Sequence, residues 1–161
     1  KDHEHLLIRP KNIFDNATPS GSSVASDVLL RLAVLTDDQD LSRIASLAIR
    51  SVREYIIKAP MGMGHWLGSL DFYLSTPIEI AIIGELDNPN TQALRSVVYS
   101  SYLPNKVLAG RQPISGSVST IYIPLLEGKE MIAEKPTAYI CEHYTCQKPV
   151  TTPESMMEQL I

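Results

Sequence analysis

The sequence predicts a chain in two parts, with helices in residues 1–76 and a small α/β unit in residues 77–161. Apolar residues recur at helical spacing in the first part, whereas the second opens on a short β-branched run after Pro77. The order strand, helix, strand follows from that run, a helix over 91–102 and a second short apolar run over 106–109. The expected class is therefore α+β or α/β, with an N-terminal helical hairpin followed by a βαβ-containing unit of about three strands.

The first helix of the hairpin is expected after a loop rich in Ser, Thr, Pro and Gly. Apolar residues recur every four positions from Val24 to Leu32, which is typical of an apolar helix face. A hydroxyl at Ser20 or Ser22 can accept a hydrogen bond from an orphan backbone N–H at the helix start. The polar run 36–40 then ends the helical pattern.

A second helix is expected over 41–56, returning antiparallel to the first. Asp37 or Asp38 can cap its start and complement its dipole. The helix stops before Pro60, because a residue that precedes proline is pushed out of the helical region. The stretch 65–74 is compatible with a third helix.

The second part is expected to contain three short strands. The run 78–84 and the run 106–109 flank a helix that begins at Pro89, so these two strands should be parallel. A third strand is expected over 137–144. A closing helix opens after Thr152.

The composition excludes several classes of protein. Hydrophobic residues make up 44% and charged residues 20%, an ordinary globular balance for a chain of 161 residues. The 14 Lys and Arg against 18 Asp and Glu give a net charge of −4, which argues against a nucleic-acid-binding protein. No apolar run approaches the ~18 residues of a membrane span, and no signal-peptide pattern is present. The expected compartment is the cytoplasm, and the missing initial Met suggests a piece of a longer chain.

The two cysteines have the spacing C-x4-C rather than the C-x2-C of thiol oxidoreductases. Cys141 and Cys146 would point to opposite faces of a regular strand, so they can meet only if the strand ends between them. We expect both thiols to be reduced, with structural roles favoured over a redox role. A zinc site with His143 would need a fourth ligand, which His3 or His5 supplies only if the chain ends meet. No metal and no cofactor are expected.

Other candidate sites are weaker. His65 and Trp66 lie beside Gly-rich segments and can be interpreted as lining a sugar pocket, because an indole face stacks on a pyranose ring. The alternative is a Trp packed between helices. Gly84 is not followed by a G-x-G-x-x-G fingerprint, and Glu85 and Asp87 would repel a phosphate. No hydrolase elbow, zinc-protease or Walker motif occurs.

Three segments carry a resemblance to a known family. They are HLLIRPK followed by DNATPSGSSVA in 5–25, LRLAVLT in 30–36, and AYICEHYTCQKPVT in 138–151. Together they resemble the carboxy-terminal part of the thioredoxin-domain-containing protein family related to spermatogenesis-associated protein 20. The resemblance covers essentially the whole chain.

The resemblance implies a thioredoxin-like domain, absent from this chain, then a six-hairpin α/α toroid like that of sugar epimerases and glycosidases. Residues 1–76 would be the end of the toroid and 77–161 a small α/β piece. The family usually has Asn where this chain has Ser22, a departure that alters the pocket if that Asn lines it. The pocket-lining candidates are Asp15, Ser20, Ser22, His65 and Trp66.

Three functions follow as hypotheses. The first is a non-catalytic structural and interaction module, with residues 22–76 exposing an apolar patch to the remainder of the parent polypeptide or to a second copy. The second is a part of a carbohydrate-active pocket, with a carbohydrate ligand in the full-length parent. The third is an accessory thiol-redox module through Cys141 and Cys146. The family has no firmly established reaction, and the fragment is not expected to be an active enzyme. Neither nucleic acid nor a membrane is an expected partner.

Overall fold

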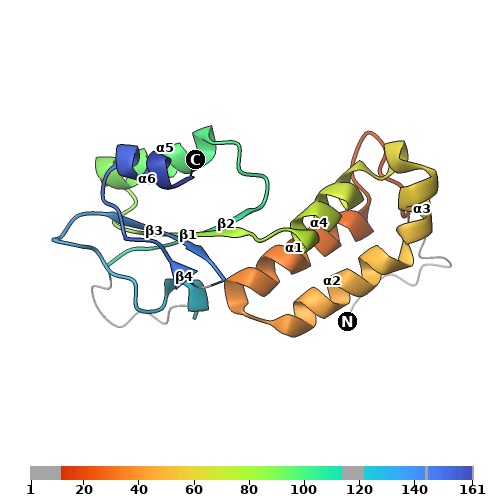
Figure 1. Ribbon diagram of the computed structural model, residues 1–161, viewed down its shortest axis with the longest axis horizontal. Helices are drawn as coiled ribbons and strands as arrows, with labels where there is room; N and C mark the ends of the chain where they lie inside the picture. The colour runs from red at the N-terminus through yellow and green to blue at the C-terminus, as the bar shows by residue number, and fades with distance from the viewer. Residues whose placement is uncertain (1–11, 114–121, 144, 161) are drawn as a thin grey trace, which may run out of the picture.

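The computed structural model describes residues 12–113, 122–143 and 145–160. Helices occupy the first half of the described residues, and a mixed sheet with two further α-helices and a 3-10 turn, η2 (Pro124–Leu126), occupies the second (Figure 1). The class is α+β, with helices first and strands after them, as expected. His3 and His5, and part of the Gly/Ser-rich segment 111–119, lie outside the described residues.

The helical hairpin is formed by α1 (Gly21–Thr36) and α2 (Gln39–Ser51). Both expected caps are confirmed: Ser20 accepts a hydrogen bond from the Ser23 backbone N–H at 3.1 Å, and Asp38 caps α2. These bonds satisfy backbone donors that the first turn of a helix leaves unpaired.

The second predicted helix is not continuous. It breaks at Val52, and α3 (Arg53–Lys58) and a 3-10 turn, η1 (Pro60–Gly62), follow. The Val52 N–H donates to Ile49 O at 3.2 Å, three residues back, which tightens the last turn of α2. Because Val52 is buried, packing holds this bend, and no proline or glycine marks it in the sequence.

The third helix is confirmed as α4 (Gly64–Leu74), which packs against α1. The four strands of the sheet follow in the order β2-β1-β3-β4. Their bounds are β1 (Ile78–Ile83), β2 (Lys106–Arg111), β3 (Thr137–Glu142) and β4 (Thr145–Cys146).

The predicted βαβ unit is confirmed by the parallel pairing of β1 and β2, in which Ile80 lies opposite Leu108. The crossover is α5 (Pro89–Ser100), capped by Asn88. The third predicted strand pairs antiparallel to β1, but it ends at Glu142, earlier than expected, and the short β4 returns beside it.

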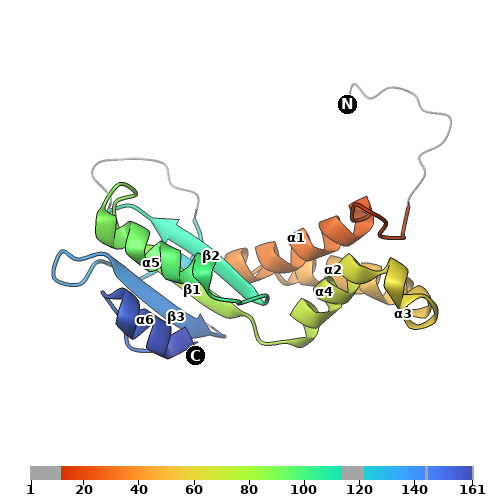
Figure 2. The ribbon, with the colours of Figure 1, turned by 90° about the horizontal axis from the view of Figure 1, so that it is seen from above.

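The two faces of the sheet belong to different clusters. On one face Ile80 and Ile82 pack with Leu94 and Val98 of α5 and with Met156 of α6 (Pro153–Leu160). Figure 2 shows α5 and α6 together on this face. The helices of the first half and the opposite sheet face share one cluster, whose buried members include Leu30, Trp66, Ala81, Ile83, Val107 and Ala109. The helices and the sheet are thus joined by a common core.

Gly84 lies where β1 leaves the sheet, in close contact with Thr91 and Pro136. A Cβ at this position would overlap Thr91 Oγ1 and lie 2.9 Å from Pro136 Cβ. We expect Gly84→Ala to lower the free energy of unfolding by about 1–3 kcal/mol, because the neighbours are packed side chains. Gly110→Ala is the control, since its Cβ would lie 3.4 Å from the nearest atom, Ile82 O. Urea denaturation followed by tryptophan fluorescence checks this, and equal losses in both variants would contradict it.

Candidate functional site

Asp15 connects the beginnings of two helices. Its Oδ1 accepts hydrogen bonds from the Ser20 N–H at 2.8 Å and from Ser23 Oγ at 2.6 Å. Its Oδ2 accepts from the backbone N–H groups of His65, at 2.8 Å, and Trp66, at 3.2 Å. One carboxylate therefore satisfies orphan donors of both α1 and α4 and lies at the positive end of two helix dipoles.

The surroundings of Asp15 favour its ionised form. Burial by itself would raise the pKa of the carboxyl. The hydrogen bonds from Ser20, Ser23, Trp66 and His65 outweigh that effect and hold the pKa below its usual value of 3.8. Asp15 is thus a charged capping group near neutral pH, and its oxygens are occupied by donors of the chain itself.

Trp66 is a core residue. It is 1% exposed, and its Nε1–H donates to Ile13 O at 2.8 Å. The indole is packed in the cluster that the helices share with the sheet, so neither of its faces is open to a sugar ring in this chain. Among the described residues, Trp66 is therefore packed in the core, as the alternative to a sugar-binding role predicted.

The remaining candidates lie as follows. Ser20 is buried at the Asp15 cluster, and His65 joins it through its backbone N–H, while His65 Nε2 is buried without a partner among the described residues. Ser22 takes no part in the cluster, and its carbonyl accepts from Ser26 Oγ at 3.0 Å. Sequence reasoning did not select Ser23, whose hydroxyl donates to Asp15 Oδ1, and no local signal marks it, because a capping box has Glu or Gln at this position. The part of the chain that the structure describes holds no group of three His, Cys, Asp or Glu that could bind a metal.

Cys141 and Cys146 form a disulfide, so the expectation of reduced thiols is wrong. The condition for their meeting is fulfilled, because β3 ends at Glu142 and β4 places Cys146 directly opposite Cys141. Their Cα atoms are 3.9 Å apart. His143, in the turn between them, has a positive φ of 48°, the backbone conformation that the reversal uses.

Reduction of this disulfide is expected to lower the free energy of unfolding by about 2 kcal/mol, because only a short loop is released into the unfolded chain. Thermal unfolding with and without dithiothreitol measures the difference. The Cys141→Ala/Cys146→Ala variant is the control, since it should not respond to the reductant. A wild-type transition that is equally insensitive would contradict a stabilising disulfide.

The helix α1 is apolar on two faces. One face is buried through Leu30 and Ala33. The other presents Val24, Val28 and Leu32, which are 40%, 46% and 40% exposed and recur one turn apart. The spacing that marks the helix in the sequence therefore lies on a face that the described residues leave partly exposed. We call these three residues the α1 stripe.

Further large apolar side chains of the helical half are exposed as well: Ile44, Leu47, Tyr55, Ile57, Met61, Leu67, Tyr73 and Leu74. Among the described residues, no helix is both long enough and apolar enough to cross a membrane.

The fold and these features define a small α+β module whose first helix, among the described residues, has a partly exposed apolar face. The chain is 30% identical over 148 residues to human spermatogenesis-associated protein 20, a match that covers 92% of this chain. The mouse protein of that name is also 30% identical, and an uncharacterized protein of Caenorhabditis elegans is 22% identical over 98% of this chain. The chain is thus a relative of the carboxy-terminal region of spermatogenesis-associated protein 20, as the three sequence segments predicted.

The chain spans about a fifth of the length of the curated relatives that it matches. No protein-family profile and no solved structure matches it. The relationship therefore describes one region of longer proteins.

Proposed function

We propose that this chain is a non-catalytic structural and interaction module of a longer polypeptide that contains a thioredoxin fold and a toroid. The α1 stripe carries the proposal, because three aliphatic residues in one row on a helix surface are stabilised by packing against another helix. The occupant is the helical region that precedes this chain in its parent. The match covers about a fifth of each relative, which supports a parent polypeptide about as long as those relatives.

The proposal predicts that one substitution has different effects in the module and in its parent. In the 161-residue chain, Val28→Glu should change the free energy of unfolding by no more than about 0.5 kcal/mol, because the side chain is half exposed. In the full-length parent it should cost about 2 kcal/mol or more, because the carboxylate would be buried in a helix interface. Chemical denaturation of both proteins measures the two effects.

Met157→Glu is the matched control, because Met157 on α6 is 44% exposed against 46% for Val28. It should have a small effect in both proteins. Equally small effects of Val28→Glu in chain and parent would contradict the proposal. A concentration-dependent dimer of the isolated chain that Val28→Glu abolishes would also contradict it, and would assign the α1 stripe to a second copy.

The disulfide supports a second candidate function, as a thiol–disulfide partner of the thioredoxin-like domain. Cys146 is exposed whereas Cys141 is 1% exposed, so an attacking thiolate would reach the Cys146 side of the bond. In the cytoplasm that we expect for this protein, disulfides are usually transient and either catalytic or redox-sensing. In the parent, Cys141→Ser leaves the Cys146 thiolate free to attack the oxidised, disulfide form of the thioredoxin-like domain, which forms a mixed disulfide and releases one thiolate of that domain. The absence of this mixed disulfide from non-reducing peptide maps would reject this role.

The carbohydrate-active pocket stays a prediction for the parent. The described residues give it no direct support, because Trp66 is buried and Asp15 is occupied by four donors of the chain.

A further inference from the structure

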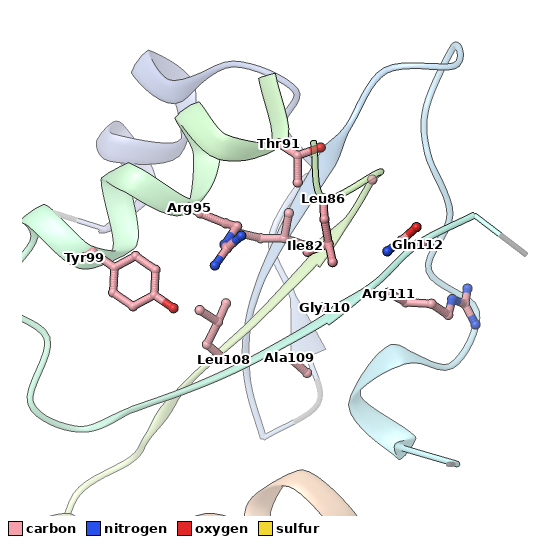
Figure 3. A pocket seen from close by; sticks show the side chains of 11 residues that line it. Ile82, Leu86, Thr91, Arg95, Tyr99, Leu108, Ala109, Gly110, Arg111 and Gln112 are labelled. Carbon is pink, nitrogen blue, oxygen red and sulfur yellow. The ribbon is translucent and has the colours of Figure 1, made fainter. Parts of the chain in front are cut away.

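A hollow lies between α5 and the edge strand β2, on the sheet face that α5 and α6 cover (Figure 3). Its volume is about 370 Å³, within the range of small-molecule sites. Gly84 and Gln112, which follow the carboxyl ends of the parallel strands β1 and β2, both line it. The crevice beyond the carboxyl ends of parallel strands is where open α/β sheets commonly bind ligands.

The floor of the hollow is apolar and its polar groups come from two elements. Ile82 and Leu108 form the floor, while Arg95 and Tyr99 extend from α5 and Gln112 extends from the end of β2. Arg95 is half-buried, and it makes no hydrogen bond or ion pair with any residue that the structure describes. A partly desolvated guanidinium without a partner beside apolar surface suits an anionic group joined to an apolar body.

Two neighbouring groups do not serve this site. Arg111 turns away from the hollow, and its guanidinium donates to Lys129 O at 2.6 Å. The Thr91 hydroxyl is buried against Gly84 rather than reachable from the hollow. Arg95 is therefore the cation that faces a ligand among the described lining residues.

The local charge narrows the class of ligand. Glu85 and Asp87 stand in the loop before α5 without lining the hollow. They add no positive charge to the site, so the single guanidinium of Arg95 can pair with one carboxylate, whereas the second negative charge of a phosphate dianion would have no cation of its own. We propose that the hollow binds a small carboxylic acid in its ionised form, with its carboxylate on Arg95 and its apolar body on Ile82 and Leu108. This site is independent of the docking role of α1.

The test uses hexanoate, its neutral analogue hexanamide and inorganic phosphate with the 161-residue chain. Amide shifts in ¹H–¹⁵N spectra should move saturably at Gly84, Gly110 and Gln112 with hexanoate, with binding about tenfold weaker for hexanamide. Arg95→Gln should lower the affinity for hexanoate by a similar factor. Arg43→Gln, which removes the same charge from α2, should leave binding unchanged.

Gly110→Val provides a second variant that keeps Arg95. A Cβ at Gly110 would lie 3.4 Å from its nearest atom, Ile82 O, so the fold should accommodate a valine there. Because Gly110 lines the hollow, the valine side chain should occupy part of its volume. Loss of hexanoate binding in this variant supports a bounded site. Equal affinity for hexanoate and hexanamide, stronger binding of phosphate, or no saturable shift up to about 10 mM would each overturn the proposal.

Discussion

Trp66→Ala is expected to lower the free energy of unfolding by about 3–5 kcal/mol, the cost of emptying a large buried aromatic site. Trp66 is 1% exposed and belongs to the core that joins the helices to the sheet. The substitution also leaves Ile13 O without its donor at 2.8 Å. Trp66 is the sole tryptophan of the chain, so the variant has no tryptophan fluorescence to follow. Circular dichroism during thermal unfolding therefore measures the loss.

Trp66→Phe separates packing from hydrogen bonding. It keeps most of the buried area but removes the Nε1–H donor, so we expect a loss of about 1–2 kcal/mol. A Trp66→Ala variant as stable as wild type would show that the indole is not a core residue. The expected destabilisation by Trp66→Ala also affects any test of the sugar pocket. A loss of sugar binding in this variant would have to be distinguished from a loss of fold.

Asp15→Ala is expected to cost about 3 kcal/mol, because it removes the acceptor of four hydrogen bonds and the capping charge of two helices. The loss should appear as a lower urea midpoint and as earlier exposure of Trp66, which follows Asp15's partner His65 in α4. Asp40→Ala is the control, because Asp40 lies in the first turn of α2 and is exposed. A loss no larger than that of Asp40→Ala would contradict the bridging role.

The pH dependence of the Asp15 contribution has a definite sign. The folded-state pKa is lowered, so the carboxylate stabilises the fold above the usual pKa of 3.8. That stability is lost as the pH falls through the lowered folded-state pKa. The difference in unfolding free energy between wild type and Asp15→Asn should therefore be largest at neutral pH and shrink in acid. A difference that stays constant with pH would mean that the charge of Asp15 contributes nothing.

The helices and strands were predictable where their signals are local. The caps at Ser20 and Asp38 and the β-branched run of β1 each act within a few residues. The bend at Val52 was missed, because it depends on how that side chain packs in the core. The strand β4 was missed for a similar reason, since two residues carry too little pattern to predict pairing.

The proximity of several candidate residues was predictable, but their arrangement was not. Four of the five candidate residues, Asp15, Ser20, His65 and Trp66, lie together around one carboxylate, whereas Ser22 does not. They form a helix-capping cluster, and the pocket that they were expected to line stays a prediction. Several of these contacts to Asp15 are made by backbone N–H groups, so a motif of side chains does not predict them. The hollow beside Arg95 had no signal in the sequence, because its walls come from separate elements that meet only in the folded sheet.

By itself, the sequence determined the order of the longer helices and of the three longer strands, the βαβ unit and the family relationship, because each depends on local spacing or on sequence identity. Only the tertiary structure decided which apolar residues form the core. Leu30 is buried while Val28, two positions earlier on the same helix, remains half exposed. Hydrophobic burial depends on which surface meets another element, and that element is supplied by segments distant in the chain.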